Sequence, residues 1–251
     1  MSTRTKMVAA NWKMHGSRAQ ATAWLDAVAG QLPPTIEAVL FPPLPYLQGL
    51  IAMHGGGPVG FGAQDVSEHQ QPGAFTGETS AAMLADIGCA HVLVGHCERR
   101  RYHGESDAQV AAKFVAARAA GLQPMLCVGE TVEQRDAGET DAVLARQLGA
   151  VVEAAGIAAF ADAAIAYEPA WAIGTGRTAT PMQAQAAHAF IRSQLAGRDA
   201  KLGRMVRVVY GGSVKPDNAR DLFSQPDVDG GLVGGASLSG ADFLAICRAA
   251  C

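Results

Sequence analysis

A single carboxylate stands where an apolar run of the chain ends. Residues 163–167 form the run, Glu168 follows directly, and the segment 170–176 contains two glycines. A carboxylate at the end of a strand, under a loop that closes and excludes water, is well placed to move a proton on carbon. An ordinary strand with a surface Glu and a glycine loop would give the same local pattern. The other strand ends must therefore decide between the two interpretations.

Polar residues and glycines also follow several other apolar runs. They are Asn11 and Lys13 after the first run, Gln64 and Asp65 after the third, His96 to Arg100 after the fourth, Gly211 to Ser213 after the seventh, and Gly234 to Ser237 after the eighth. Glycines at such places expose backbone N–H groups, which favour an anion such as phosphate. Lys13 would supply the opposing full charge. The combined set predicts an anion site that contains one imidazole and one base.

The strands and helices that must position these residues can be predicted from the pattern of apolar residues along the chain. Predicted strands lie at residues 7–10, 38–41, 59–62, 91–94, 123–128, 163–167, 205–210 and 229–233. Predicted helices lie at residues 19–29, 80–87, 107–119, 141–154, 181–195, 216–223 and 241–249, with a weaker one at 46–53. Thr180 and Pro181 suit an N-cap and first helical position, and Pro216 suits a first turn. Gly88 and Gly121 stand where a glycine ends a helix.

Eight strands alternating with eight helices predict an α/β fold with a parallel sheet. The length of 251 residues is typical of a closed (β/α)8 TIM barrel, with residues 1–251 forming one catalytic domain. The rival is an open, doubly wound sheet. That fold usually shows a glycine-rich turn after its first strand, where this chain has Asn11, Trp12 and Lys13. In a barrel, the residues that follow the strands would meet at one mouth.

Composition excludes several classes of partner and compartment. The formal net charge is -3, so we expect no nucleic acid partner. No apolar run reaches the roughly 18 residues of a membrane span, and the N-terminus has no secretory signal, so we expect no membrane association. Five cysteines form an odd count without framework spacing. Reduced thiols and a cytoplasmic location are the prediction.

Seven motifs in register give the chain a resemblance to a known family. They are Asn11-Trp12-Lys13-Met14, residues 73–78 (GAFTGE), residues 94–100 (VGHCERR), Tyr167-Glu168-Pro169, residues 170–176 (AWAIGTG), residues 210–214 (YGGSV) and residues 232–238 (LVGGASL). In this order the chain resembles triosephosphate isomerase over essentially its whole length. The resemblance implies interconversion of dihydroxyacetone phosphate and D-glyceraldehyde 3-phosphate through an enediolate, in glycolysis and gluconeogenesis, with no cofactor.

The resemblance also implies a role for each residue of the set. Glu168 matches the base, His96 a neutral electrophile, and Lys13 the cation that holds the anionic substrate. The remaining positions are Asn11 as a substrate contact, Gly174, Ser213, Gly234 and Gly235 as phosphate-binding positions, and Ile173 and Leu232 as an apolar clamp over the base. Glu98 is left with two interpretations: direct proton transfer, or an ion pair with Lys13 or an arginine.

Two neighbouring residues raise a question about the resting site. Cys97 stands where the family usually has a serine that hydrogen-bonds the base when the lid is open. A thiol is a weaker donor, so the resting position of Glu168 is open. We expect no metal at His96 and Cys97, because adjacent residues on a turn do not readily converge on one ion.

The segment at residues 64–78 resembles a long family loop that enters a pocket of a second subunit. This implies a symmetric homodimer with Met14 and Thr76 at the interface. His15 replaces a usual Asn, which affects only local loop and interface contacts.

Two other functions stay open: a different phosphate-binding barrel, such as an aldolase, and a non-catalytic scaffold. An aldolase needs a Schiff-base lysine at a strand end. Lys13 is the candidate, whereas Lys113 and Lys201 fall in or near predicted helices.

Overall fold

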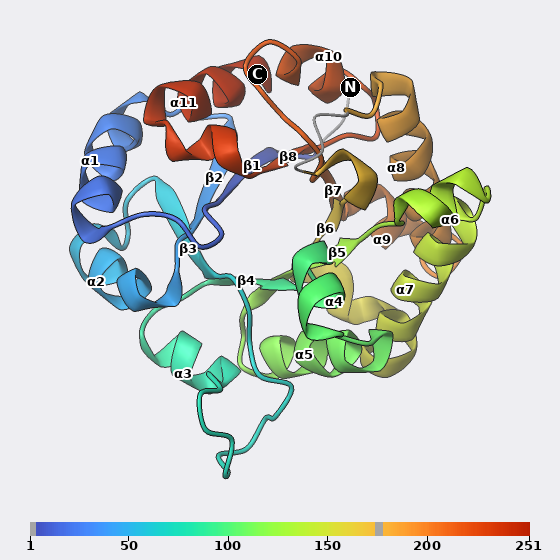
Figure 1. Cartoon of the computed structure of the whole chain (residues 1–251), viewed down its shortest axis with the longest axis horizontal. Coiled ribbons are helices and arrows are strands. Elements are labelled where there is room, and N and C mark those ends of the chain that lie inside the picture. The colour runs from blue at the N-terminus through green and yellow to red at the C-terminus, as the bar shows by residue number, and fades with distance from the viewer. Residues whose placement is uncertain (1–3, 174–177) are drawn as a thin grey trace.

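Eight parallel strands form a closed barrel in the order of the sequence (Figure 1). The computed structural model describes residues 4–173 and 178–251. The strands are β1 (Lys6–Asn11), β2 (Ile36–Phe41), β3 (Val59–Ala63), β4 (His91–Val94), β5 (Gln123–Val128), β6 (Ala164–Tyr167), β7 (Arg207–Tyr210) and β8 (Gly230–Val233). Each strand pairs with the next, and β1 pairs with β8 to close the ring. The predicted TIM barrel is confirmed.

Helices surround the barrel on its outer side (Figure 1). They are α1 (Arg18–Val28), α2 (Leu44–His54), α3 (Ala81–Asp86), α4 (Cys97–His103), α5 (Asp107–Ala119), α6 (Val132–Asp136), α7 (Thr140–Ala155), α8 (Pro181–Ala196), α9 (Ala200–Met205), α10 (Ala219–Phe223) and α11 (Gly240–Ala249). Short 3-10 segments are η1 (Ala29–Gln31), η2 (Ile157–Asp162), η3 (Ala170–Ala172) and η4 (Gly235–Leu238). In the described residues, no helix is both long and apolar enough to cross a membrane.

Several helix boundaries follow the predicted capping signals. Thr180 accepts a hydrogen bond from the Gln183 N–H at the start of α8, with Pro181 in the first turn. Gly88 and Gly121 have φ values of 83° and 79°, in the left-handed region that glycine adopts without a Cβ penalty. The prediction for Pro216 is wrong, because α10 begins only at Ala219.

The alternation of side chains along the strands divides the core into two parts. On β1, Val8 and Ala10 face outward into the layer between barrel and helices. Met7 and Ala9 face the barrel interior. Both faces of every strand are thus covered, which explains why the strands read as continuous apolar runs. The predicted strand at residues 205–210 is shorter than expected, since Met205 ends α9 and β7 begins at Arg207.

His188 of α8 is an uncharged residue of the outer layer and makes stability depend on pH. Its ring is fully buried and meets Tyr167 edge-on at 5.8 Å between centroids. Burial lowers the pKa of His188 from 6.5 to about 4. The unfolded chain therefore takes up a proton between these pH values that the folded chain does not.

We expect this histidine to destabilise the fold as the pH falls from 6.5 to 4. The depressed pKa contributes stability that is fully present above pH 6.5 and is lost toward pH 4, by about 3 kcal/mol. In His188→Phe, the free energy of unfolding in urea should fall less steeply over this range. Parallel pH dependences for the parent and the variant would contradict the assignment.

Candidate active site

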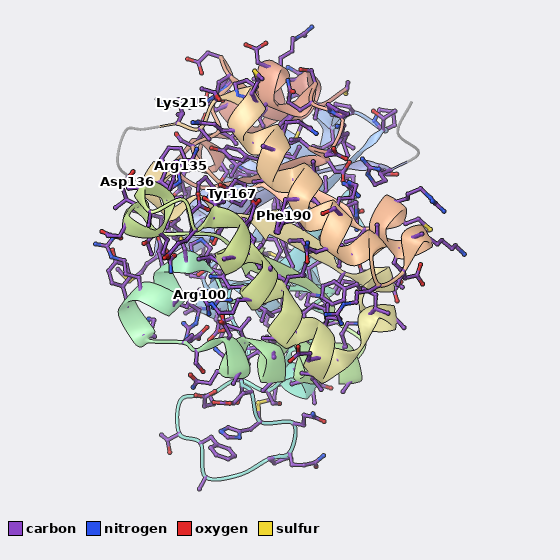
Figure 2. The ribbon with its side chains drawn as sticks, turned by 90° about the vertical axis from the view of Figure 1, so that its right-hand side faces the viewer. Arg100, Arg135, Asp136, Tyr167, Phe190 and Lys215 are labelled. Atoms are coloured by element: carbon purple, nitrogen blue, oxygen red, sulfur yellow. The ribbon has the colours of Figure 1, made fainter. Side chains whose placement is uncertain are left out.

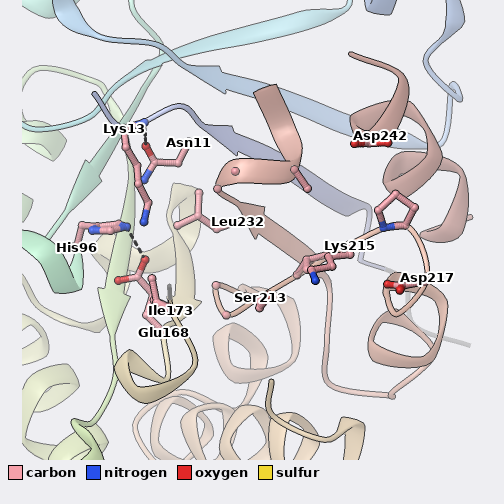
Figure 3. A pocket seen from close by; sticks show the side chains of 17 residues that line it. Asn11, Lys13, His96, Glu168, Ile173, Ser213, Lys215, Asp217, Leu232 and Asp242 are labelled. Atoms are coloured by element: carbon pink, nitrogen blue, oxygen red, sulfur yellow. Dashed lines mark hydrogen bonds and ion pairs between the residues drawn. The ribbon is translucent and has the colours of Figure 1, made fainter. Parts of the chain in front are cut away.

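The ends of the strands enclose a cavity of about 630 Å³ at one mouth of the barrel (Figure 3). Most of the residues predicted from the sequence line it: Asn11, Lys13, His96, Glu168, Ile173, Ser213, Leu232, Gly234 and Gly235. These residues come from strands far apart in the sequence, and barrel closure alone brings them together. Gly174, the remaining predicted phosphate contact, lies outside the described residues.

The carboxylate of Glu168 is held by the main chain of Cys97. Glu168 follows β6 and is 1% exposed. Its Oε2 accepts a hydrogen bond of 2.8 Å from the Cys97 N–H. Burial, together with the charges of Glu168 and Glu98, raises the pKa of the Cys97 thiol and keeps it protonated. The backbone amide of residue 97 therefore helps to fix the position of the carboxylate.

The imidazole of His96 lies beside this carboxylate. The residue caps the N-terminus of α4, where its Nδ1 accepts a hydrogen bond of 3.2 Å from the Glu98 N–H. Because Nδ1 is an acceptor, the neutral ring carries its proton on Nε2. Nε2 lies 3.1 Å from Oε1 of Glu168, as the dashed line in Figure 3 shows. The local fold thus selects the tautomer that can donate into the cavity.

A metal ion does not fit this arrangement. Ligand atoms of His96, Cys97 and Glu168 lie within 4.8 Å of one another, so the two adjacent side chains do converge, contrary to expectation. An ion on Nε2 would need the proton to move to Nδ1, where it would oppose the Glu98 N–H. The thiol would also have to ionise against two neighbouring carboxylates. The chemistry of these donors supports the prediction that no metal binds here.

Lys13 adopts a backbone conformation that is rare for a residue with a Cβ. Its φ is 51°, the only positive value at a non-glycine residue within the described ranges. Side-chain contacts hold it: the Lys13 N–H donates to Asn11 Oδ1 at 3.0 Å, and Gln64 donates to the Lys13 carbonyl at 2.8 Å. Strain of about 1–3 kcal/mol at such a residue persists only where its surroundings enforce it. The strained turn aims the ammonium into the cavity.

Glu98 is the partner of this ammonium. Its Oε1 lies 2.5 Å from Lys13 Nζ. Of the two interpretations left open from the sequence, the structure contains the ion pair, and the partner is Lys13. The pair fixes the long lysine side chain beside the imidazole of His96, whose Nδ1 is 3.8 Å from the second oxygen of Glu98.

Two glycines that line the cavity have different structural roles. A Cβ at Gly211 would lie 2.7 Å from Cγ of Glu168, so only glycine leaves room for the carboxylate side chain. A Cβ built at Gly235 meets nothing within 4 Å, which leaves this backbone open toward the cavity. Gly211 belongs to packing around Glu168, whereas Gly235 lines the cavity with open space beside its backbone.

Sequence reasoning missed Glu130, which organises the start of the lid segment. The buried carboxylate accepts hydrogen bonds from Tyr167 Oη at 3.0 Å and Trp171 Nε1 at 2.9 Å, and Arg135 Nη1 lies 3.1 Å away. The Arg135 guanidinium also stacks over the Trp171 ring at 4.4 Å. Glu130 stands two residues after β5, so the strand-end rule, applied to that strand as well, would have found it.

A buried ionic network connects α4 to the protruding loop. Lys113 Nζ contacts Asp65 at 2.7 Å and Glu105 at 2.5 Å. Arg99 of α4 reaches the same two carboxylates. The network joins the helix that begins after His96 with the residues that follow β3. Lys113 is therefore engaged in a structural cluster on α5 and is not available as a Schiff-base lysine.

The two predicted interface residues are both exposed. Met14 has 93% of its surface accessible, and Thr76 lies in the loop that extends away from the barrel (Figures 1 and 2). In this loop, His69 stacks on Phe75 with 3.6 Å between ring centroids. A second cavity of about 770 Å³, lined in part by Met14, His15 and Tyr102, adjoins the first.

Comparison with known proteins agrees with this geometry over nearly the whole chain. A family model described as triosephosphate isomerase matches residues 6–250. The chain is 60% identical to a triosephosphate isomerase of Stenotrophomonas maltophilia strain K279a and 59% identical to one of Xanthomonas axonopodis pv. citri, in each case over 98% of both chains. A Xanthomonas oryzae pv. oryzae relative of the same name is 58% identical over the same share. The chain belongs to the triosephosphate isomerase family.

Proposed function

We propose that the chain is an aldose–ketose isomerase that interconverts dihydroxyacetone phosphate and D-glyceraldehyde 3-phosphate, in glycolysis and gluconeogenesis. The observation that carries the proposal is the closeness of a buried carboxylate and an imidazole nitrogen. Glu168 Oε1 and His96 Nε2 lie 3.1 Å apart beside a cavity that also contains Lys13. A base and a hydrogen-bond donor at one place are what proton transfer next to a carbonyl requires.

In the forward direction, Glu168 removes a proton from the hydroxymethyl carbon of dihydroxyacetone phosphate. The C–H electron pair forms the C=C bond of an enediolate, and negative charge moves to the former carbonyl oxygen. The Nε2–H of His96 stabilises this charge and passes its proton between the two oxygens. The protonated Glu168 then returns the proton to the neighbouring carbon, which gives the aldehyde. Atoms and electrons balance without a cofactor or a metal.

The phosphate end of the substrate would lie on the other side of the cavity. We assign it to the backbone N–H groups of Ser213, Gly234 and Gly235, with Gly174 as the contact outside the described residues. Lys13, with Asn11 beside it, faces both ends of the site and stabilises the negative charge of the intermediate. A backbone open to the cavity at Gly235 supports this assignment.

The apolar residues over the base would exclude water during the reaction. Ile173 and Leu232 line the cavity next to Glu168 (Figure 3). Closure of the segment at residues 170–176 would press them against the carboxylate and strengthen every interaction of the enediolate. Removal of water would also keep the intermediate from losing its phosphate.

A coupled assay tests the function directly. The purified chain is supplied with D-glyceraldehyde 3-phosphate, and the dihydroxyacetone phosphate formed is reduced by glycerol-3-phosphate dehydrogenase with NADH. We expect NADH consumption that scales with the amount of protein, while His96→Gln with its fold intact should turn over far more slowly. A parent protein without activity would overturn the proposal and favour a non-catalytic barrel.

We also propose that the chain forms a symmetric homodimer through Met14 and the loop around Thr76. Support comes from the exposure of Met14 and from the cavity beside it, which would receive the loop of a second copy. Sedimentation at micromolar concentration should give about twice the 25.9 kDa of the chain. Met14→Glu should shift the mass toward the monomer, whereas Met182→Glu, at an 80% exposed position on α8, should not. A monomeric parent would contradict the proposal.

Two broader proposals accompany the activity. The whole chain acts as one catalytic domain, which is supported by a family match that runs from residue 6 to residue 250. The location is cytoplasmic, which is supported by five cysteines that are all free thiols.

A further inference from the structure

We propose that Lys215 steers doubly charged triose phosphates into the site and so adds to the preference for charged over uncharged trioses. The inference rests on the proposed function and adds a residue to it. Lys215 lines the main cavity on the side of Ser213, as Figure 3 shows, and is exposed. It follows β7 by five residues and lies outside every motif that carried the family resemblance.

The main chain of Lys215 is fixed beside the phosphate end. Its N–H donates to Asn218 Oδ1 at 2.8 Å, and Asn218 Nδ2 donates to the Ser213 carbonyl at 3.0 Å. The Lys215 carbonyl accepts hydrogen bonds from the N–H groups of Asn218 and Ala219. One amide side chain therefore braces both ends of the segment from Ser213 to Lys215. The lysine side chain can move, but its charge stays near the predicted phosphate contacts.

The ammonium of Lys215 is available to an incoming anion. Within residues 4–173 and 178–251 it makes no hydrogen bond or ion pair. Lys13, the other lysine that lines this cavity, is paired with Glu98 at 2.5 Å, so its field is partly cancelled at a distance. Before contact, an approaching phosphate would therefore sense Lys215 more strongly than Lys13.

Because carboxylates lie near Lys215, its positive charge matters for the electrostatic potential on this side of the cavity. Asp217 and Asp242 line the same side of the cavity, and the chain as a whole carries -3. Without Lys215, two carboxylates would remain at the entrance of the cavity. The doubly charged substrate would have to pass them. Charges at the rim of a binding site act mainly on association and are screened by salt. The effect should therefore appear in kcat/KM at low ionic strength.

The test compares two variants of equal net charge. Lys215→Gln removes the charge at the cavity, and Lys201→Gln removes one from the exposed surface of α9, before the opposite end of β7. At an ionic strength of about 10 mM, we expect Lys215→Gln to lose about threefold to fivefold in kcat/KM for D-glyceraldehyde 3-phosphate, with kcat unchanged. The inhibition constant of inorganic phosphate should rise by a similar factor. Lys215→Arg should restore both values, and Lys201→Gln should change neither.

Salt and an uncharged substrate separate steering from a structural role. The loss should disappear at about 0.5 M salt, where the Debye length is only about 4 Å. Turnover of D-glyceraldehyde, which lacks the phosphate, should be the same in Lys215→Gln and the parent. Asp217→Asn should act in the opposite direction and raise kcat/KM about twofold at low salt.

Three results would overturn the proposal. They are equal values for Lys215→Gln and Lys201→Gln at low salt, a loss that persists at high salt, and a matching loss with D-glyceraldehyde. Failure of the proposed function would look different, because the parent itself would then fail to isomerise triose phosphates.

Discussion

Replacement of Glu168 by Gln is expected to lower kcat/KM for triose phosphates by about 10³-fold or more, because an amide cannot take up the proton. The substitution changes little else. The amide oxygen can still accept the Cys97 N–H that now holds Oε2 at 2.8 Å. The measurement is the coupled assay with D-glyceraldehyde 3-phosphate, together with the inhibition constant or dissociation constant of inorganic phosphate.

Binding of phosphate should stay within a few fold of the parent, since Glu168 is not among the residues that we assign to the phosphate. A second variant, Glu168→Asp, keeps the carboxylate but withdraws it by about one methylene. A shift of about 1 Å can cost about 10²-fold, so this variant should fall between the parent and Glu168→Gln. A Gln variant that turned over near the parent rate would show that another group is the base.

Replacement of Lys13 by Met is expected to lower kcat/KM by about 10²- to 10³-fold, the effect of one well-aimed donor to a developing negative charge. Methionine keeps an unbranched side chain of similar reach and should adopt the φ of 51° at a similar cost. The loss should therefore reflect the missing ammonium. KM should rise and kcat should fall, because the lysine faces both the bound anion and the intermediate.

Glu98→Gln is the matched control for this variant. It removes the ion pair with Lys13 but leaves the cation in place, so its loss should be clearly smaller. The loss in Lys13→Met should also be smaller with D-glyceraldehyde than with its phosphate. Equal losses with both substrates would contradict a role of Lys13 in holding the phosphate.

The sequence predicted the barrel because each strand can be recognised as a short apolar run. Strands β4 and β5 and helix α5 occur at the expected residues, since they are buried and bounded by turn residues. The sequence did not predict α4 and α6, which contain no buried residue and therefore no apolar period. The helix start expected at Pro216 is wrong, because residues 216–218 form a turn and α10 begins at Ala219.

The site could be assembled from strand ends because closure of the barrel places those ends at one mouth. The contacts made by main-chain groups could not be predicted from the sequence in the same way. That the Cys97 N–H reaches Glu168, 71 positions further along the chain, depends on tertiary geometry. Glu130 could have been found as a residue that follows β5, but its three partners, from α6, β6 and the segment after β6, could not be predicted from the residues beside it.

The hold on Glu168 by a backbone amide has a consequence for how position 97 can vary. Every amino acid except proline carries this N–H. The hydrogen bond from residue 97 to Glu168 Oε2 is therefore available with any side chain at this position, provided that the residue is not proline.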